Sequence, residues 1–129
     1  MPNELRGELE LDLGGRVYVL RATWDAVRNM ETLTKRPWGQ TFKAAVNGEL
    51  GADEMISVLY ACARAGELDL ADFPKYNQFA EAVYKRGLLT CMTAASRVLT
   101  LSAFGGEPVP EGPVDAGKDE ATTGLIGGA

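Results

Sequence analysis

The stretch GELELDLGGRVYVLR, residues 7–21, decides the fold class, because no later stretch shows comparable strand-like alternation. Leucines alternate with acidic residues up to Gly14-Gly15, and a second apolar run begins directly after this pair. Two alternating runs joined by a two-residue Gly-Gly loop predict a β-hairpin. With Gly14-Gly15 as the loop, Leu13 lies opposite Arg16 and Leu11 opposite Tyr18. One face of the hairpin then carries the apolar residues Leu9, Leu11, Leu13, Tyr18, Leu20 and Ala22. An isolated hairpin is marginal in water, so the rest of the chain is expected to cover this face.

The opposite face of the hairpin is expected to be acidic along its first strand. Glu8, Glu10 and Asp12 lie there, opposite Arg21, Val19 and Val17 respectively. A hard-cation site is conceivable, but such sites usually need ligands that converge from a bend. We therefore favour a solvated face with Arg21 opposite Glu8. The strand edges have no visible partner in the sequence, so another strand could add there.

Helices are expected after the hairpin. Thr23 is suited to cap a helix that begins at Trp24, and Pro37 is expected to end it. Further helices are expected over residues 40–46, 53–65, 72–86 and 88–103. Asp72-Phe73-Pro74 is expected to open the helix over 72–86. Gly66, as a C′ residue, and Gly87 are expected to end two of them. The fold class is therefore α+β: an N-terminal two-stranded β-hairpin followed by a bundle of four or five α-helices.

Charge and composition divide the chain into residues 1–104, a single hairpin-plus-helices domain, and 105–129, a flexible acidic Gly/Pro-rich tail. The tail has five acids and one lysine, which leaves 13 acids and 12 bases in the domain. We expect the tail to be disordered. A nearly neutral domain without a basic stripe argues against nucleic-acid binding. Neither a signal peptide nor a membrane-spanning run is visible, so no membrane partner and a cytoplasmic location are expected.

Residues for catalysis or cofactor binding are scarce. The chain has no histidine, and its two cysteines, Cys62 and Cys91, are expected to be buried free thiols. It has no Walker loop, nucleophile elbow or dinucleotide fingerprint. We therefore expect that the protein is not an enzyme and that it binds neither a cofactor nor a metal ion. Trp24 and Trp38 could anchor an interface, although such residues more often close the edge of a core.

The opening RGELELDLGGRVYVLRATWDAV, residues 6–27, resembles the gene transfer agent and tailed-phage family of tail assembly proteins, also described as tail tube or tail assembly chaperone proteins. The likeness rests on Arg6-Gly7-Glu8, on the turn over 11–15 and on Arg21-Ala22-Thr23. A weaker likeness covers NGELGADEMISVLYACARAGE, residues 47–67. Together the resemblance spans about residues 5–104.

The resemblance implies a role in building a long-tailed particle, and two functions are compatible with it. The first, which we favour here, is a non-enzymatic assembly chaperone that binds the tape measure protein, the tail tube protein or both. The second is a structural tube or connector subunit, which would call for a chain richer in strands. Self-association is possible in either case. The candidate interaction residues are Val17, Val19, Trp38, Leu88, Leu89, Met92 and Phe104, although the helix that contains Leu88 could instead be a central core helix.

Overall fold

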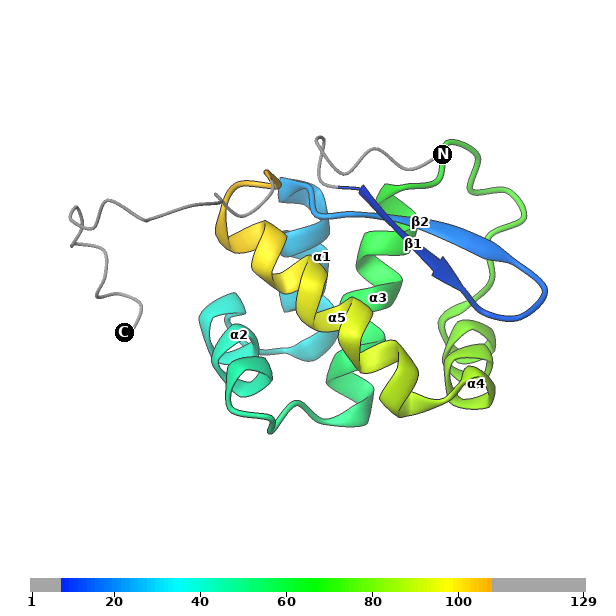
Figure 1. Ribbon diagram of the computed structural model, residues 1–129. Coiled ribbons are helices and arrows are strands. Elements are labelled where there is room, and N and C mark those ends of the chain that lie inside the picture. Colours follow the sequence, from blue (N-terminus) through cyan, green and yellow to red (C-terminus); the bar gives the residue numbers. More distant parts are fainter. Residues whose placement is uncertain (1–7, 108–129) are drawn as a thin grey trace.

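The N-terminal hairpin has the predicted register. In the computed structural model, which describes residues 8–107, strand β1 (Glu8–Asp12) pairs antiparallel with β2 (Val17–Arg21). Leu9 lies opposite Leu20, and Leu11 lies opposite Tyr18. All four side chains are buried, as the alternation predicted. The hairpin lies across one side of the helices and covers them like a lid (Figure 1).

Five helices follow the hairpin within the described residues, so the α+β prediction is confirmed. They are α1 (Trp24–Thr34), α2 (Trp38–Val46), α3 (Ala52–Ala65), α4 (Tyr76–Arg86) and α5 (Leu88–Ala103). Thr23 caps α1 as expected, because its hydroxyl accepts a hydrogen bond from the amide of Ala26 at 3.1 Å. The predicted disordered tail falls almost wholly on residues 108–129, which lie outside the described part of the chain.

Helix α3 is the centre of the core. Nine consecutive residues of this helix, Met55–Ala63, are buried, because α1, α4, α5 and β2 surround it (Figure 1). Helix α5 buries a stripe against α3 as well, which confirms that it is a core helix. The leucines of β1 pack against the helices, so the hairpin and the helices share one apolar core.

The boundary between α1 and α2 differs from the prediction. Helix α1 ends at Thr34, and Lys35 takes a left-handed conformation with φ 59°. Pro37 does not end α1; it immediately precedes α2, which starts two residues earlier than expected. The carboxylate of Glu31 accepts a hydrogen bond from the amide of Trp38 at 2.8 Å and so satisfies a free donor of the new helix.

The start of α4 was also predicted wrongly. Asp72 is not the cap; the helix begins at Tyr76, and the side chain of Gln78 accepts a hydrogen bond from the amide of Lys75 at 3.0 Å. In the loop before α4, the carbonyl of Pro74 accepts a hydrogen bond from the hydroxyl of Tyr60 at 2.9 Å. This contact with α3 competes with the local capping signal at Asp72.

Gly66 ends α3, but for a reason other than the one expected. It is not left-handed, since its φ is −88°. Instead, a Cβ built on Gly66 would lie 1.9 Å from the carbonyl oxygen of Val19 in β2. The glycine permits two backbones to approach closely, at the place where the end of α3 meets the middle of β2. Gly87, by contrast, does end α4 with a positive φ of 115°.

Candidate interaction surfaces

An aromatic cluster holds the hairpin on the bundle. Its members are Tyr18, Tyr60, Phe73, Tyr76 and Phe79. Tyr18 from β2 contacts Phe79 from α4, edge to face, with ring centroids 5.2 Å apart. Such pairs contribute beyond the area that they bury. The cluster therefore fixes the position of β2 relative to α3 and α4.

Arg16 ties the tip of the hairpin to the loop before α4. Its guanidinium lies 4.7 Å from the ring centroid of Tyr18, which is a cation–π distance. The same group lies 3.7 Å from the carboxylate of Glu67 and donates to the carbonyl of Asp72 at 3.3 Å. The tip and the loop thus form one surface, although more than fifty residues separate Arg16 from Asp72 in the sequence.

Two phenols of the aromatic cluster have raised pKa values. Burial raises the pKa of Tyr18, and the nearby charge of Arg16 opposes this change. Burial also raises the pKa of Tyr76 to about 12, with a further contribution from its hydrogen bond to Asp53 at 2.6 Å. Both groups therefore remain protonated near neutral pH, where they act as hydrogen-bonding and packing groups.

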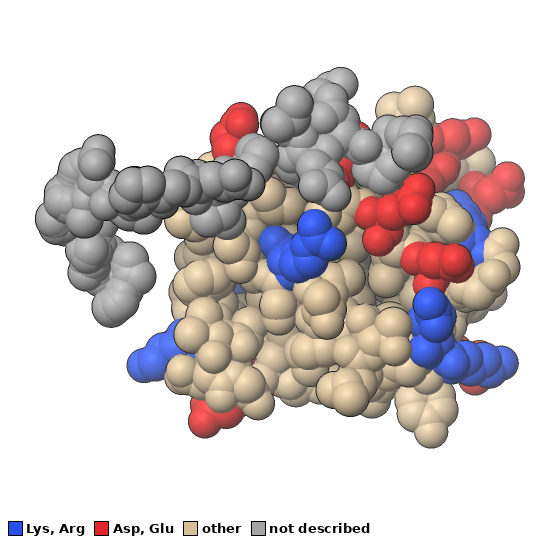
Figure 2. Space-filling model, in the orientation of Figure 1, with Lys and Arg blue, Asp and Glu red and all other residues tan. Residues whose placement is uncertain are grey.

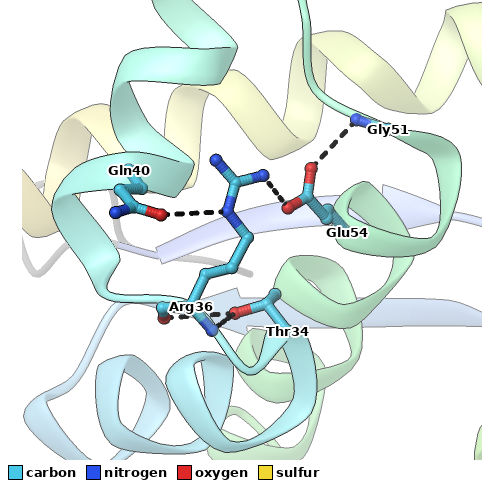
Figure 3. A network of polar contacts seen from close by, with 5 residues as sticks. All are labelled: Thr34, Arg36, Gln40, Gly51 and Glu54. Atoms are coloured by element: carbon cyan, nitrogen blue, oxygen red, sulfur yellow. Dashed lines mark hydrogen bonds and ion pairs between the residues drawn. The ribbon is translucent and has the colours of Figure 1, made fainter.

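A polar junction links α1, α2 and α3 (Figure 3). Arg36 lies between α1 and α2 and forms an ion pair with Glu54 of α3. Its Nε also donates to the side-chain oxygen of Gln40 at 3.4 Å. The other carboxylate oxygen of Glu54 accepts from the amide of Gly51 at 3.2 Å. Each group has a structural partner, so this junction positions helices.

The predicted interaction residues do not form one patch. Val17, Leu89 and Phe104 are exposed, whereas Val19, Trp38, Leu88 and Met92 are partly buried. Val17 lies at the hairpin tip, the three α5 residues lie at the start of that helix, and Phe104 follows its end (Figure 1). Leu89 is the most exposed of the seven, at 85 %.

Trp38 closes the edge of the core, as the more common role of such residues suggested. Its ring stacks on Phe42 with centroids 5.0 Å apart, and its Nε1 donates to the hydroxyl of Ser102 at 2.9 Å. Trp24 does the opposite: at the first position of α1 it is 72 % exposed. The expectation that a tryptophan closes the core is therefore correct for Trp38 and wrong for Trp24.

Other exposed apolar residues were missed or misplaced. Leu68 is fully exposed in the loop after α3, and Val46 is exposed at the end of α2. The helical spacing of Tyr84 and Leu33 favours buried positions, but both side chains are exposed. The acidic neighbours of Leu68 were a signal for an exposed loop. The exposure of Tyr84 depends on which neighbours α4 has, which helical periodicity does not reveal.

The acidic row occupies the outward face of β1. Glu8 forms an ion pair with Arg21 at 3.5 Å, and the side chain of Asp12 accepts from the amide of Gly14 at 2.8 Å. Figure 2 shows acidic side chains gathered around the hairpin, in the upper right of the view. Among residues 8–107, no group of three or more Cys, Asp or Glu side chains is placed to hold a metal ion.

The two cysteines are buried free thiols, as predicted. Burial raises the pKa of Cys62 to about 12, and it also raises the pKa of Cys91. Both thiols are therefore poor nucleophiles near neutral pH. In the described part of the chain, no helix is both long and apolar enough to cross a membrane.

Comparison with protein families gives a match over most of the chain. The sequence profile of a family described as "Phage tail tube protein, GTA-gp10" matches residues 6–106. This range contains the hairpin and all five helices, so the match covers the whole described fold. No curated protein and no solved structure matches the chain.

Proposed function

Because the chain belongs to the GTA-gp10 family of phage tail tube proteins, we propose that it is a structural tail component of a phage-like particle, a tube or connector subunit. The observation that carries the proposal is the family match over residues 6–106. It favours the structural alternative over the chaperone that the sequence led us to prefer. The proposed partners are other tail proteins and further copies of this chain.

Exposed apolar side chains occur at the hairpin tip, in the loop after α3 and at the start of α5, represented by Val17, Leu68 and Leu89. They are scattered singly, which is normal for a protein surface, so the proposal rests on the family match and not on an apolar patch. We propose that the chain performs no catalysis, since its sequence has no histidine and both of its cysteines are buried free thiols.

An assembly chaperone remains a second candidate because of one observation. The sheet in residues 8–107 has two strands, β1 and β2. A tube built by pairing strands between subunits would need more strands than this hairpin supplies. A chaperone would instead bind the tape measure protein or the tail tube protein during assembly and leave before the particle is complete.

Quantitative mass spectrometry of purified particles separates the two functions. A structural subunit is expected in the finished particle in a fixed ratio to the major tail proteins. A chaperone would be absent from finished particles and would co-purify with the tape measure protein from assembling cells. Absence from particles would overturn the structural proposal, and absence from both preparations would overturn the chaperone as well.

A further inference from the structure

The hydrogen-bond register of the hairpin determines which backbone groups face the outer edge of β1. The amide of Leu13 donates to the carbonyl of Arg16 at 2.9 Å, so this pair is hydrogen-bonded across the turn. Bonded and non-bonded pairs alternate along an antiparallel ladder. The backbone groups of Leu9 and Leu11 therefore bond to β2. Those of the alternate residues point away from β2, and these residues are Glu8, Glu10 and Asp12.

The two edges of the hairpin are not equivalent. The edge of β2 is closed at Val19, because Gly66 approaches its carbonyl too closely for another strand to enter. On the β1 edge, the carbonyl of Asp12 accepts a hydrogen bond from Nε of Arg86 at 2.9 Å. Within residues 8–107, neither the amide nor the carbonyl of Glu10 has a backbone hydrogen-bond partner on the edge of β1 that faces away from β2. The β1 edge is therefore open around Glu10.

The side chains of β1 decide which strand can enter. A second copy that paired β1 with β1 would place acidic residues opposite acidic residues on the outward face. Like charges directly opposite one another destabilise a strand pair, and opposite charges stabilise it. A suitable strand therefore carries Lys or Arg opposite Glu10 and at every second position. The residues between them, next to Leu9 and Leu11, would be apolar.

We propose that the open edge of β1 binds an extended segment of another polypeptide, with basic residues at alternating positions, as a third antiparallel strand. Backbone hydrogen bonds to Glu10 supply the pairing, and the acidic row selects the charge of the segment. The inference goes beyond the proposed particle role and does not rest on it, since it concerns a binding activity of the isolated chain.

The test uses the full chain and the synthetic peptide TKVKVKT, blocked at both ends, in an NMR titration at millimolar concentration. We expect TKVKVKT to bind at least about tenfold more tightly than the charge-reversed TEVEVET. The amide of Glu10 should gain protection from hydrogen exchange on binding. A third peptide, TKVKVKT with N-methyl groups on its lysine amides, keeps every charge but cannot donate to the edge, and it should not protect this amide.

Two variants complete the experiment. Glu10→Lys should weaken binding of TKVKVKT and strengthen that of TEVEVET, while Glu81→Lys, on the exposed face of α4, is the matched control and should change neither. Circular dichroism establishes that each variant is folded. The proposal is overturned if TKVKVKT fails to bind, if the N-methylated peptide binds equally well, or if Glu10→Lys has no more effect than Glu81→Lys. It is also overturned if sedimentation shows that the free chain already dimerises and that Glu10→Lys abolishes the dimer, since a second copy would then occupy the edge.

Discussion

The contact between Gly66 and β2 gives the sharpest prediction about the fold. Replacing Gly66 with alanine adds one methyl group, whose carbon would lie 1.9 Å from the carbonyl oxygen and 2.8 Å from the carbonyl carbon of Val19. Cβ atoms essentially never lie within 3.0 Å of a heavy atom from a distant part of the chain. Both obstructing atoms belong to the backbone, so no side-chain rotation relieves the clash.

The size of the effect follows from what must move. The oxygen has to retreat by at least 1.1 Å, the difference between 1.9 and 3.0 Å. This shift displaces β2, which carries the buried side chains of Tyr18 and Leu20 on either side of Val19. Overpacking that forces the backbone to move costs typically 1–3 kcal/mol, and we expect Gly66→Ala to lower the free energy of unfolding by about 3 kcal/mol. The total for a domain is only about 5–15 kcal/mol.

Urea denaturation followed by circular dichroism measures the change. With a denaturant slope of about 2 kcal/mol/M, the midpoint should fall by about 1.5 M. Gly39→Ala is the matched control, since Gly39 lies in α2 and the added carbon meets nothing within 4 Å apart from its chain neighbours and the nearby backbone of its own helix. This variant should gain about 0.5–1 kcal/mol from the better helix propensity of alanine. The reasoning is refuted if Gly66→Ala is as stable as the parent protein.

Three further predictions concern the core and its titratable groups. Phe79→Ala should cost about 3–5 kcal/mol in urea denaturation, because Phe79 is fully buried within the aromatic cluster; a loss under 1 kcal/mol would contradict that packing. The folded pKa of Tyr76 is raised to about 12 from 10.0, so the stability that it contributes is present below pH 10 and is lost as the pH rises toward 12. The unfolding free energy of Tyr76→Phe should therefore fall less steeply between pH 10 and 12 than that of the parent protein. The surface variant Tyr84→Phe should behave like the parent, and equal slopes in all three proteins would contradict the burial of the Tyr76 phenol. Cys62 and Cys91 should resist a thiol reagent at pH 8 until urea unfolds the chain, and rapid labelling of the native protein would show that they are not buried.

Sequence patterns determined the hairpin and the last helix well. The alternation of Leu9 and Leu11 with acidic residues permits one register, because a slip by one residue would turn the leucines to solvent. Gly87 and the apolar stripe that follows it likewise located α5 to within the residue. These features depend on neighbours in the chain, so local reasoning was sufficient.

The features that the sequence did not reveal depend on contacts between distant residues. The loop before α4 contacts α3 through the hydrogen bond from Tyr60 to Pro74, which the capping signal at Asp72 gave no reason to expect. The role of Gly66 depends on the backbone of Val19. For the candidate surface, the acidic row predicted the charge of β1, but the difference between its open edge and the closed edge of β2 required the structure.

The lid role of the hairpin has a consequence for how strongly its edge can bind. Leu9 and Leu11 are buried against the helices, so the backbone of Glu10 is held in strand geometry before any partner arrives. The incoming segment alone has to be ordered, which costs about 1–2 kcal/mol per residue, or about 5–10 kcal/mol for five residues. A few backbone hydrogen bonds, each contributing about 0.5–1.5 kcal/mol net, do not offset this cost without the charge pairs and apolar contacts. A single edge should therefore bind weakly, and its affinity becomes useful where many copies engage a multivalent partner together, as they would along a particle.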